Sequence, residues 1–314
     1  MRHIIFSDLH NNYFALREFY KYLLSISDEI KLYFLGDIIG YYKFDVRIIE
    51  LLKVMINKWN MDICIGNHDA AFFNHLGLTE FKIKFSNSLN ETIKSNYKHK
   101  KKIMELFSNI NFNQLDIKIN TMHYTLSHGG ISDIINDYFY PDLSFIKWSN
   151  YKFRSGMNYI CGHTHRPFIK TVKDNIFINV GSLGMPRDGD PRMCFLEINN
   201  NNLQIMRRFY NMDLLYDYNF NLNNNIRNRI YMGGNSKYIH LNLLSLNEEK
   251  IYVESIFNNV FFFDRCIYVI YKNCLFQILK LAYNGKKYLL RFQAQEILSN
   301  NIQNLIRRIK YEML

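Results

Sequence analysis

Five short segments of the chain carry side chains that bind divalent metal ions, and each follows a run of apolar residues. They read Asp-Leu-His at 8–10, Gly-Asp at 36–37, Gly-Asn-His-Asp at 66–69, His-Gly-Gly at 128–130 and Gly-His-Thr-His at 162–165. An apolar run that stops at such a segment is typical of a buried strand that ends in a functional loop. Carboxylate, imidazole and amide ligands suit Mn, Fe, Co, Ni or Zn better than Ca.

Together the segments supply enough ligands for two divalent metals. A carboxylate shared between them would hold the ions roughly 3.5–4 Å apart, and Asp37 is the candidate bridge. Asp8 and His10 lie two apart on an extended segment, so both side chains can point to one side, and His163 and His165 repeat that spacing. A lone histidine more often caps or packs, so we expect structural roles for the histidines outside the segments, which are His3, His75, His99, His123 and His240.

The order and spelling of these segments resemble the calcineurin-like metallophosphoesterase superfamily. The resemblance implies hydrolysis of phosphomono- or phosphodiester bonds by a hydroxide that bridges two metals, with manganese favoured over iron, nickel, cobalt or zinc. It implies one metal held by Asp8, His10, Asp37 and His165, and another held by Asp37, Asn67, His128 and His163.

His68 is not a ligand in this resemblance. It stands between Asn67 and Asp69, and we expect the Asp69 carboxylate to accept a hydrogen bond from the imidazole and to orient it. His68 is therefore the candidate proton donor to the leaving group, with Asp69 as its catalytic partner.

A sixth segment, Asn179 to Arg192, resembles a loop of the small bacterial and archaeal phosphoesterases described as diadenosine-tetraphosphatase-like, although Val180 replaces the usual proline. The phosphoprotein phosphatases carry a phosphate-binding arginine where this chain has Ile65. Arg187 and Arg192 are candidate substitutes for substrate binding, and ion-paired or solvent-facing roles are equally open for both. Asn12 is a third substrate-binding candidate, although Asn11 or Asn12 can also cap the helix that follows.

The pattern of apolar residues predicts an α/β fold. A strand at 2–6, a helix, a strand ending at Leu35, a helix over about 45–59 and a strand at 61–65 indicate parallel strands with ligands beyond their carboxyl ends. Strands follow at 158–161, 167–172, 176–180, 193–198 and 203–209, after two short ones within 115–127. We expect these later strands to form a second, more antiparallel sheet, giving a four-layered α/β/β/α metallophosphoesterase sandwich with the site at its edge.

Two further regions have no assigned chemistry. Residues 70–112 are polar and mostly helical, and their lysines at 98 and 100–102 indicate either a cap-like insertion that meets an anionic substrate or a solvated helix face. The resemblance covers residues 1–235. The pattern of residues 236–314 predicts a C-terminal α+β extension, with strands at 250–256, 260–271, 275–281 and 288–292 and a helix at 293–311. Four roles are open for this extension: an accessory domain, a dimer interface, a partner-binding module, or structural packing against the core.

Composition narrows the remaining possibilities. With 314 residues, 48% hydrophobic content and four prolines, the chain suits an ordered globular protein. The net charge of +11 favours anionic partners such as nucleotides or nucleic acid, or it marks a basic protein with no special partner. Five cysteines without a Cys-x-x-Cys pair favour a reduced compartment.

A metal segment close behind Met1 argues against a removable signal, and the most apolar C-terminal run, 260–263, is too short to span a bilayer. We therefore expect a soluble, cytoplasmic, metal-dependent phosphoesterase of open oligomeric state. The alternative is a non-catalytic metal-binding scaffold, or a regulatory protein that binds nucleic acid or another partner.

Overall fold

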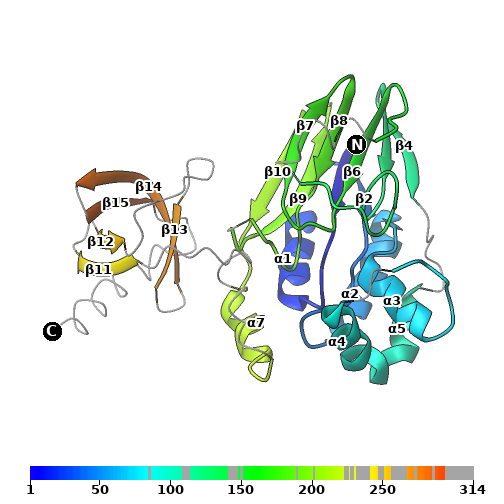
Figure 1. The fold of residues 1–314 in the computed structure, drawn as a ribbon, viewed down its shortest axis with the longest axis horizontal. Helices are drawn as coiled ribbons and strands as arrows, with labels where there is room; N and C mark the ends of the chain where they lie inside the picture. The colour runs from blue at the N-terminus through cyan, green and yellow to red at the C-terminus, as the bar shows by residue number, and fades with distance from the viewer. Residues whose placement is uncertain are drawn as a thin grey trace. The chain divides into compact units, whose positions relative to one another are not determined.

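The computed structural model describes residues 1–83, 86–107, 114–140, 148, 151–188, 190–200, 202–222, 226 and 230, and the backbone of five strands between 241 and 293. The chain divides into two compact units, Met1–Gly234 and Asn235–Leu314 (Figure 1). All six segments singled out in the sequence lie in the first unit. No helix in these described stretches is long and apolar enough to cross a membrane.

The first sheet of this unit is mixed. In spatial order its strands are β10 (Asn202–Arg208), β9 (Met193–Asn199), β1 (Arg2–Phe6), β2 (Ile30–Phe34) and β3 (Asp62–Ile63). The three N-terminal strands are parallel, as the alternation of strands and helices in the sequence predicts. Strand β9 runs antiparallel to β1, and β10 runs antiparallel to β9. The strand expected at 61–65 is shorter because only Asp62 and Ile63 keep the ladder with β2.

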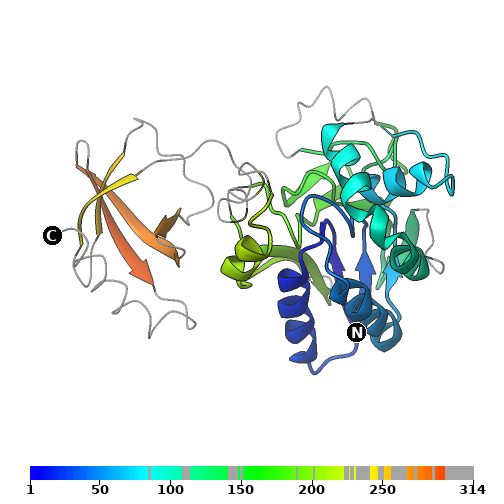
Figure 2. The ribbon, with the colours of Figure 1, turned by 90° about the horizontal axis from the view of Figure 1, so that it is seen from below.

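Two helices cover one face of this sheet, α1 (Tyr13–Leu24) and α2 (Arg47–Trp59), which lie side by side in Figure 2. The ring of Phe19 on α1 packs 4.8 Å from Phe6 and 4.9 Å from Phe195, so the helix buries its apolar stripe on the strands. The side chain of Asn12 accepts the backbone N–H of Ala15 and caps α1. A short helix, α7 (Met212–Tyr218), follows β10.

The second sheet is also mixed. In spatial order its strands are β4 (Leu115–Ile119), β5 (Met122–Leu126), β6 (Met157–Cys161), β8 (Asn175–Asn179) and β7 (Phe168–Val172). Its three central strands are parallel and both edge strands are antiparallel, so the expected antiparallel character is confined to the edges.

The assignment of the last two strands to this second sheet is wrong, because β9 and β10 extend the first sheet beside β1. The reason lies in the loop before β9, where Leu183 donates to the Ser7 carbonyl and Gly184 to that of Asp8. These bonds tie the loop to the chain that leaves β1, and β9 then pairs with β1 itself.

The two sheets pack face to face over one apolar core. Ile5, Leu35 and Leu196 from the first sheet and its loops meet Leu126 and Ile160 from the second, all of them buried. The other face of the second sheet is covered by an aromatic cluster that includes Phe139, Trp148 and Phe177. Two mixed sheets flanked by helices confirm the predicted α/β sandwich.

The insertion between the sheets is helical, as predicted. It contains α3 (Asn67–His75), α4 (Asn87–Asn96), a 3₁₀ turn (Tyr97–His99) and α5 (Lys100–Phe107). Leu89 and Ile93 of α4 pack on Ala71 of α3. Lys98, Lys101 and Lys102 are exposed, as expected of a solvated face.

The second unit contains one antiparallel sheet in the order β11-β12-β15-β14-β13. Its strands are β11 (Leu241–Leu246), β12 (Ile251–Ser255), β13 (Ile267–Tyr271), β14 (Cys274–Asn284) and β15 (Lys287–Gln293). Strand β11 had no counterpart in the sequence prediction. The first residue of the helix expected at 293–311 ends β15 instead, and the rest of that helix lies outside the described residues.

Candidate metal centre

The metal-binding segments follow the carboxyl ends of parallel strands in both sheets. Asp8 and His10 follow β1, Asp37 follows β2, Asn67 begins α3 after β3, His128 follows β5, and His163 and His165 follow β6. Because the sheets pack face to face, loops from both reach one place, where their side chains form two adjoining clusters.

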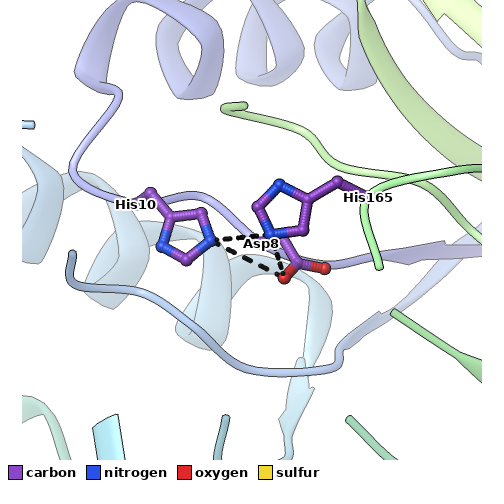
Figure 3. Close-up of side chains that lie close together, drawn as sticks. All are labelled: Asp8, His10 and His165. Atoms are coloured by element: carbon purple, nitrogen blue, oxygen red, sulfur yellow. Dashed lines mark hydrogen bonds and ion pairs between the residues drawn. The ribbon is translucent and has the colours of Figure 1, made fainter. Parts of the chain in front are cut away.

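The first cluster consists of Asp8, His10 and His165, all fully buried or nearly so, which point toward one another in Figure 3. The Nε2 atom of His165 lies 3.1 Å from Asp8 Oδ1, and Nε2 of His10 lies 3.7 Å from the same oxygen. The two Nε2 atoms are 3.1 Å apart. Three potential ligand atoms therefore surround one point.

The second cluster consists of Asp37, His128 and His163, with Asn67 beside it. The Nε2 atom of His128 lies 3.1 Å from Asn67 Oδ1, 3.1 Å from His163 Nδ1 and 3.4 Å from Asp37 Oδ2. Asp37 Oδ2 is also 3.7 Å from Nε2 of His10 in the first cluster. One carboxylate oxygen thus stands between the clusters, where a bridging ligand would lie.

Backbone carbonyl groups fix which nitrogen of three histidines carries the proton. Nδ1 of His10 lies 3.3 Å from the Ile39 oxygen, Nδ1 of His128 lies 2.9 Å from the Leu35 oxygen, and Nδ1 of His165 lies 2.5 Å from the Met185 oxygen. A carbonyl only accepts, so each Nδ1 is protonated and each neutral ring presents a lone pair at Nε2. Hydrogen bonds of this kind orient ligating histidines.

The facing lone pairs of His10 and His165 are unfavourable unless a cation lies between them. Three more buried atoms of the clusters lack a hydrogen-bond partner, namely Asp8 Oδ1, Asp37 Oδ2 and His163 Nε2. Buried polar atoms without partners are costly. The donor set, two carboxylates with imidazole nitrogens and an amide oxygen, fits divalent transition metals.

The electrostatics of the clusters agree with this fit. Burial lowers the pKa of His165 to about 4 and that of His163 to about 3, which keeps both rings in the neutral, metal-binding form. For His128 burial acts in the same direction but is outweighed by the Asp37 carboxylate, and the pKa is raised to about 9. The Asp37 carboxylate therefore favours positive charge at this position, which a metal cation would also supply.

Backbone strain is concentrated at the same residues. Five of the seven expected ligands have positive φ angles, at Asp8 (57°), His10 (50°), Asp37 (58°), His163 (65°) and His165 (58°). Such a conformation costs a residue other than glycine about 1–3 kcal/mol and persists where the surroundings impose it, often at functional sites.

His68 lies at the edge of the first cluster, and the prediction that its imidazole donates a hydrogen bond to Asp69 is wrong. One of its ring nitrogens lies within 4.8 Å of ligand atoms on His10 and Asp37. Its Nδ1 contacts Thr92 Oγ1 at 2.8 Å instead of Asp69. The Asp69 carboxylate is turned toward the backbone and accepts the N–H groups of Gly66, Asp37, Ile38 and Ile39. Asp69 therefore shapes the loop that carries Asp37.

The three candidate substrate-binding residues have different surroundings. Asn12 is buried. Its side-chain oxygen caps α1, and its side-chain nitrogen donates to the Gly184 carbonyl. Arg192 forms an ion pair with Asp190 at 2.6 Å. Arg187 is half-buried, and its Nη2 donates to the Tyr41 hydroxyl at 2.7 Å.

Sequence reasoning missed the aromatic and polar residues that surround the clusters. The ring of Tyr41 lies 4.7 Å from His10 and 4.8 Å from His68, and that of Tyr138 lies 4.1 Å from His163. Thr92 contacts His68 from the helical insertion. These residues carry no metal-binding signature, although Tyr41 follows the Gly-Asp segment by only four positions.

Comparison with known proteins agrees with this architecture. An uncharacterized protein of Methanocaldococcus jannaschii is 26% identical over 249 residues, covering 68% of this chain and 89% of that protein. A probable metallophosphoesterase of Methanothermobacter thermautotrophicus is 43% identical over 44 residues, 14% of this chain and 26% of that protein.

Solved structures that share the fold include the following two. A metallophosphoesterase from Sphaerobacter thermophilus matches with a TM-score of 0.54 and 22% identity, over 74% of this chain and 99% of that one. A hypothetical protein from Pyrococcus horikoshii matches with a TM-score of 0.60 and 16% identity, over 75% and 99%. Residues 1–201 match the calcineurin-like phosphoesterase superfamily domain. The chain belongs to the calcineurin-like phosphoesterase superfamily.

Proposed function

We propose that this chain is a phosphoesterase that hydrolyses phosphomono- or phosphodiester bonds with two divalent metal ions. The observation that carries the proposal is the pair of adjoining clusters whose lone pairs converge and which Asp37 Oδ2 joins. Asp8, His10, Asp37 and His165 would hold one ion, and Asp37, Asn67, His128 and His163 the other. Manganese is the favoured metal, with iron, nickel, cobalt and zinc as alternatives.

Two divalent ions at these positions would supply Lewis-acid activation of water and offset the negative charge that develops on the phosphoryl group. The protein holds the ligands in place through the backbone carbonyls described above. The buried setting excludes bulk water and strengthens each electrostatic interaction.

Arg187 is the residue best placed to bind the phosphoryl group. In the part of the chain that the structure describes, it has no carboxylate within ion-pair distance, and its Nε is buried without a hydrogen-bond partner. After burial, its charge is the next cause that lowers the pKa of His165, so it acts directly on the first cluster. A half-buried guanidinium with an unsatisfied N–H can bind an anion, and phosphate oxygens are suitable acceptors.

His68 is the proposed proton donor to the leaving group. Its backbone N–H donates to Asp37 Oδ1 at 2.9 Å, which fixes the residue beside the expected bridging carboxylate. The ring is buried between His10 and Tyr41, at centroid distances of 4.9 Å and 4.8 Å. A histidine with a free nitrogen at this position can protonate a departing oxygen.

The substrate class follows from less specific features. The loop from Asn179 to Arg192 and the net charge of +11 support an anionic substrate such as a nucleotide or dinucleoside polyphosphate. Nucleic acid as a partner and a cytoplasmic location stay predictions from composition, as does an accessory role for residues 236–314.

The test is turnover by the purified full chain after metal removal and reloading with each candidate metal. We expect metal-dependent hydrolysis of p-nitrophenyl phosphate or bis(p-nitrophenyl) phosphate, abolished in Asp8→Asn and retained in Asp116→Asn. Asp116 is the matched control because it lies on β4 of the second sheet, where its carboxylate pairs with Arg154. Two bound metals without turnover of either ester, of nucleotides, of dinucleoside polyphosphates or of phosphopeptide would instead favour a non-catalytic scaffold.

A further inference from the structure

The imidazole of His68 is held by a side chain from the helical insertion. Its Nδ1 lies 2.8 Å from Thr92 Oγ1 on α4, and both residues are buried, with 3% and 1% of their surface exposed. In the sequence the two residues are 24 positions apart. The insertion therefore reaches the metal centre through this contact.

The direction of the hydrogen bond follows from the other neighbour of Thr92. The Thr92 hydroxyl donates to the Ser88 carbonyl at 2.9 Å, one turn earlier in α4. A hydroxyl has one proton, so toward His68 it presents a lone pair and must accept. The donor is then Nδ1–H of His68, which leaves Nε2 as the nitrogen that exchanges a proton.

We propose that Thr92 is a positioning residue that fixes the ring and the tautomer of His68 for proton transfer from Nε2. The proposal rests on the proposed role of His68 as proton donor. In the step itself, the Nε2–H bond of the imidazolium breaks, and its proton goes to the oxygen of the leaving group. The ring remains neutral, with its Nδ1–H still donated to Thr92.

A second contact ties the helix of Thr92 to the loop that carries His10. Asn96, one turn further along α4, accepts a hydrogen bond from Asn11 at 3.2 Å, and Asn11 directly follows His10. Gly40 also approaches this end of the ring, because an added Cβ there would stand 2.9 Å from His68 Nδ1. Thr92 and a backbone position without a side chain thus both border the Nδ1 end of the ring.

The test compares variants of Thr92 on two substrates that differ in their leaving group. Thr92→Val removes the hydroxyl with little change of shape, Thr92→Ala removes it without adding a methyl group, and Thr92→Ser retains it. We expect Thr92→Val and Thr92→Ala to lower kcat for an alkyl phosphate ester roughly tenfold, about the value of one hydrogen bond, with KM little changed. Turnover of the p-nitrophenyl ester should fall much less, because p-nitrophenolate leaves without a proton. Thr92→Ser should retain both rates.

Thr125→Val is the matched control, because the Thr125 hydroxyl is buried but donates to Asp116 on the second sheet. It should leave the ratio of the two rates unchanged. Equal losses on both esters in the Thr92 variants, or loss of metal, would overturn the proposal. If His68→Ala is selective for the alkyl ester and Thr92→Val is not, only the role of Thr92 fails.

A measurement without turnover completes the test. In the zinc-loaded full chain, the ¹⁵N shifts of the His68 ring should report a protonated Nδ1, and Thr92→Val should mix the two tautomers. A protonated Nε2 with bare Nδ1 in the parent chain would overturn the proposal even if no ester is hydrolysed.

Discussion

Replacing Gly162 by alanine should displace the Asp8 carboxylate without changing any charge of the site. Gly162 follows β6, and its backbone passes so close to Asp8 that an added Cβ would lie 2.6 Å from Asp8 Oδ2 and would also overlap the Ser7 side chain. Its φ angle is not in the left-handed region, so the effect of the substitution is steric alone.

The expected magnitude follows from that distance. Ordinary contact begins at 3.4 Å, so the carboxylate must retreat by about 0.8 Å. Metal sites tolerate about 0.2 Å, so we expect metal affinity to fall by roughly 10- to 100-fold. A displacement near 1 Å in a catalytic group costs about 10² in rate. The free energy of unfolding should fall by about 1–3 kcal/mol.

Gly156→Ala at the other end of β6 is the matched control. Gly156 has a φ of 70° with nothing within 4 Å of an added Cβ, so alanine there strains the backbone by about 1–2 kcal/mol without touching the site. Metal titration, turnover and thermal unfolding would be measured for both variants. Unchanged metal affinity and rate in Gly162→Ala would refute the view that this backbone approach positions Asp8.

Three further experiments test other parts of the account. His68→Ala should keep both metals, because Asn67 and His128 still complete the second position, and should slow an alkyl ester by roughly 10²–10⁴-fold but an activated aryl ester much less; equal losses would exclude a proton donor. Arg187→Met should raise KM and lower kcat for phosphate esters, whereas Arg192→Met, which removes an ion pair with Asp190, should affect stability; the reverse pattern would reassign the phosphate contact. A chain ending at Gly234 should keep metals and turnover, since all six site segments precede residue 193, and a folded, metal-loaded but inactive truncation would place part of the site in the second unit.

The ligand positions could be predicted from the sequence because each follows an apolar strand. Asp8, Asp37 and His128 stand at strand ends whose burial pattern is visible in one dimension. Parallel strands bring such ends to one edge, so proximity in space follows from the fold class. The division of the later strands between the two sheets was harder to predict. Strand β9 pairs with β1 although the two are far apart in the sequence, and no local pattern reports that pairing.

The groups that orient the ligands could not be predicted. The carbonyl oxygens of Leu35, Ile39 and Met185 fix three histidine tautomers, and every residue has a carbonyl, so sequence gives no signal. Asp69 was misassigned because neighbours in sequence diverge at the start of a helix, where its carboxylate instead accepts backbone N–H groups. Thr92 lies in a polar insertion, where only the tertiary packing of α4 brings it to His68.

The central claim is that Asp37 joins two metal positions, and metal content measures it directly. Asp37→Asn can keep the acceptor for the His68 backbone N–H, now 2.9 Å from Oδ1, while it removes the charge at Oδ2. Elemental analysis should find two divalent ions in the parent chain and in the Asp116→Asn control, and fewer than two in Asp37→Asn with its circular dichroism unchanged. Two ions retained in Asp37→Asn, or no more than one in the parent chain, would contradict the account.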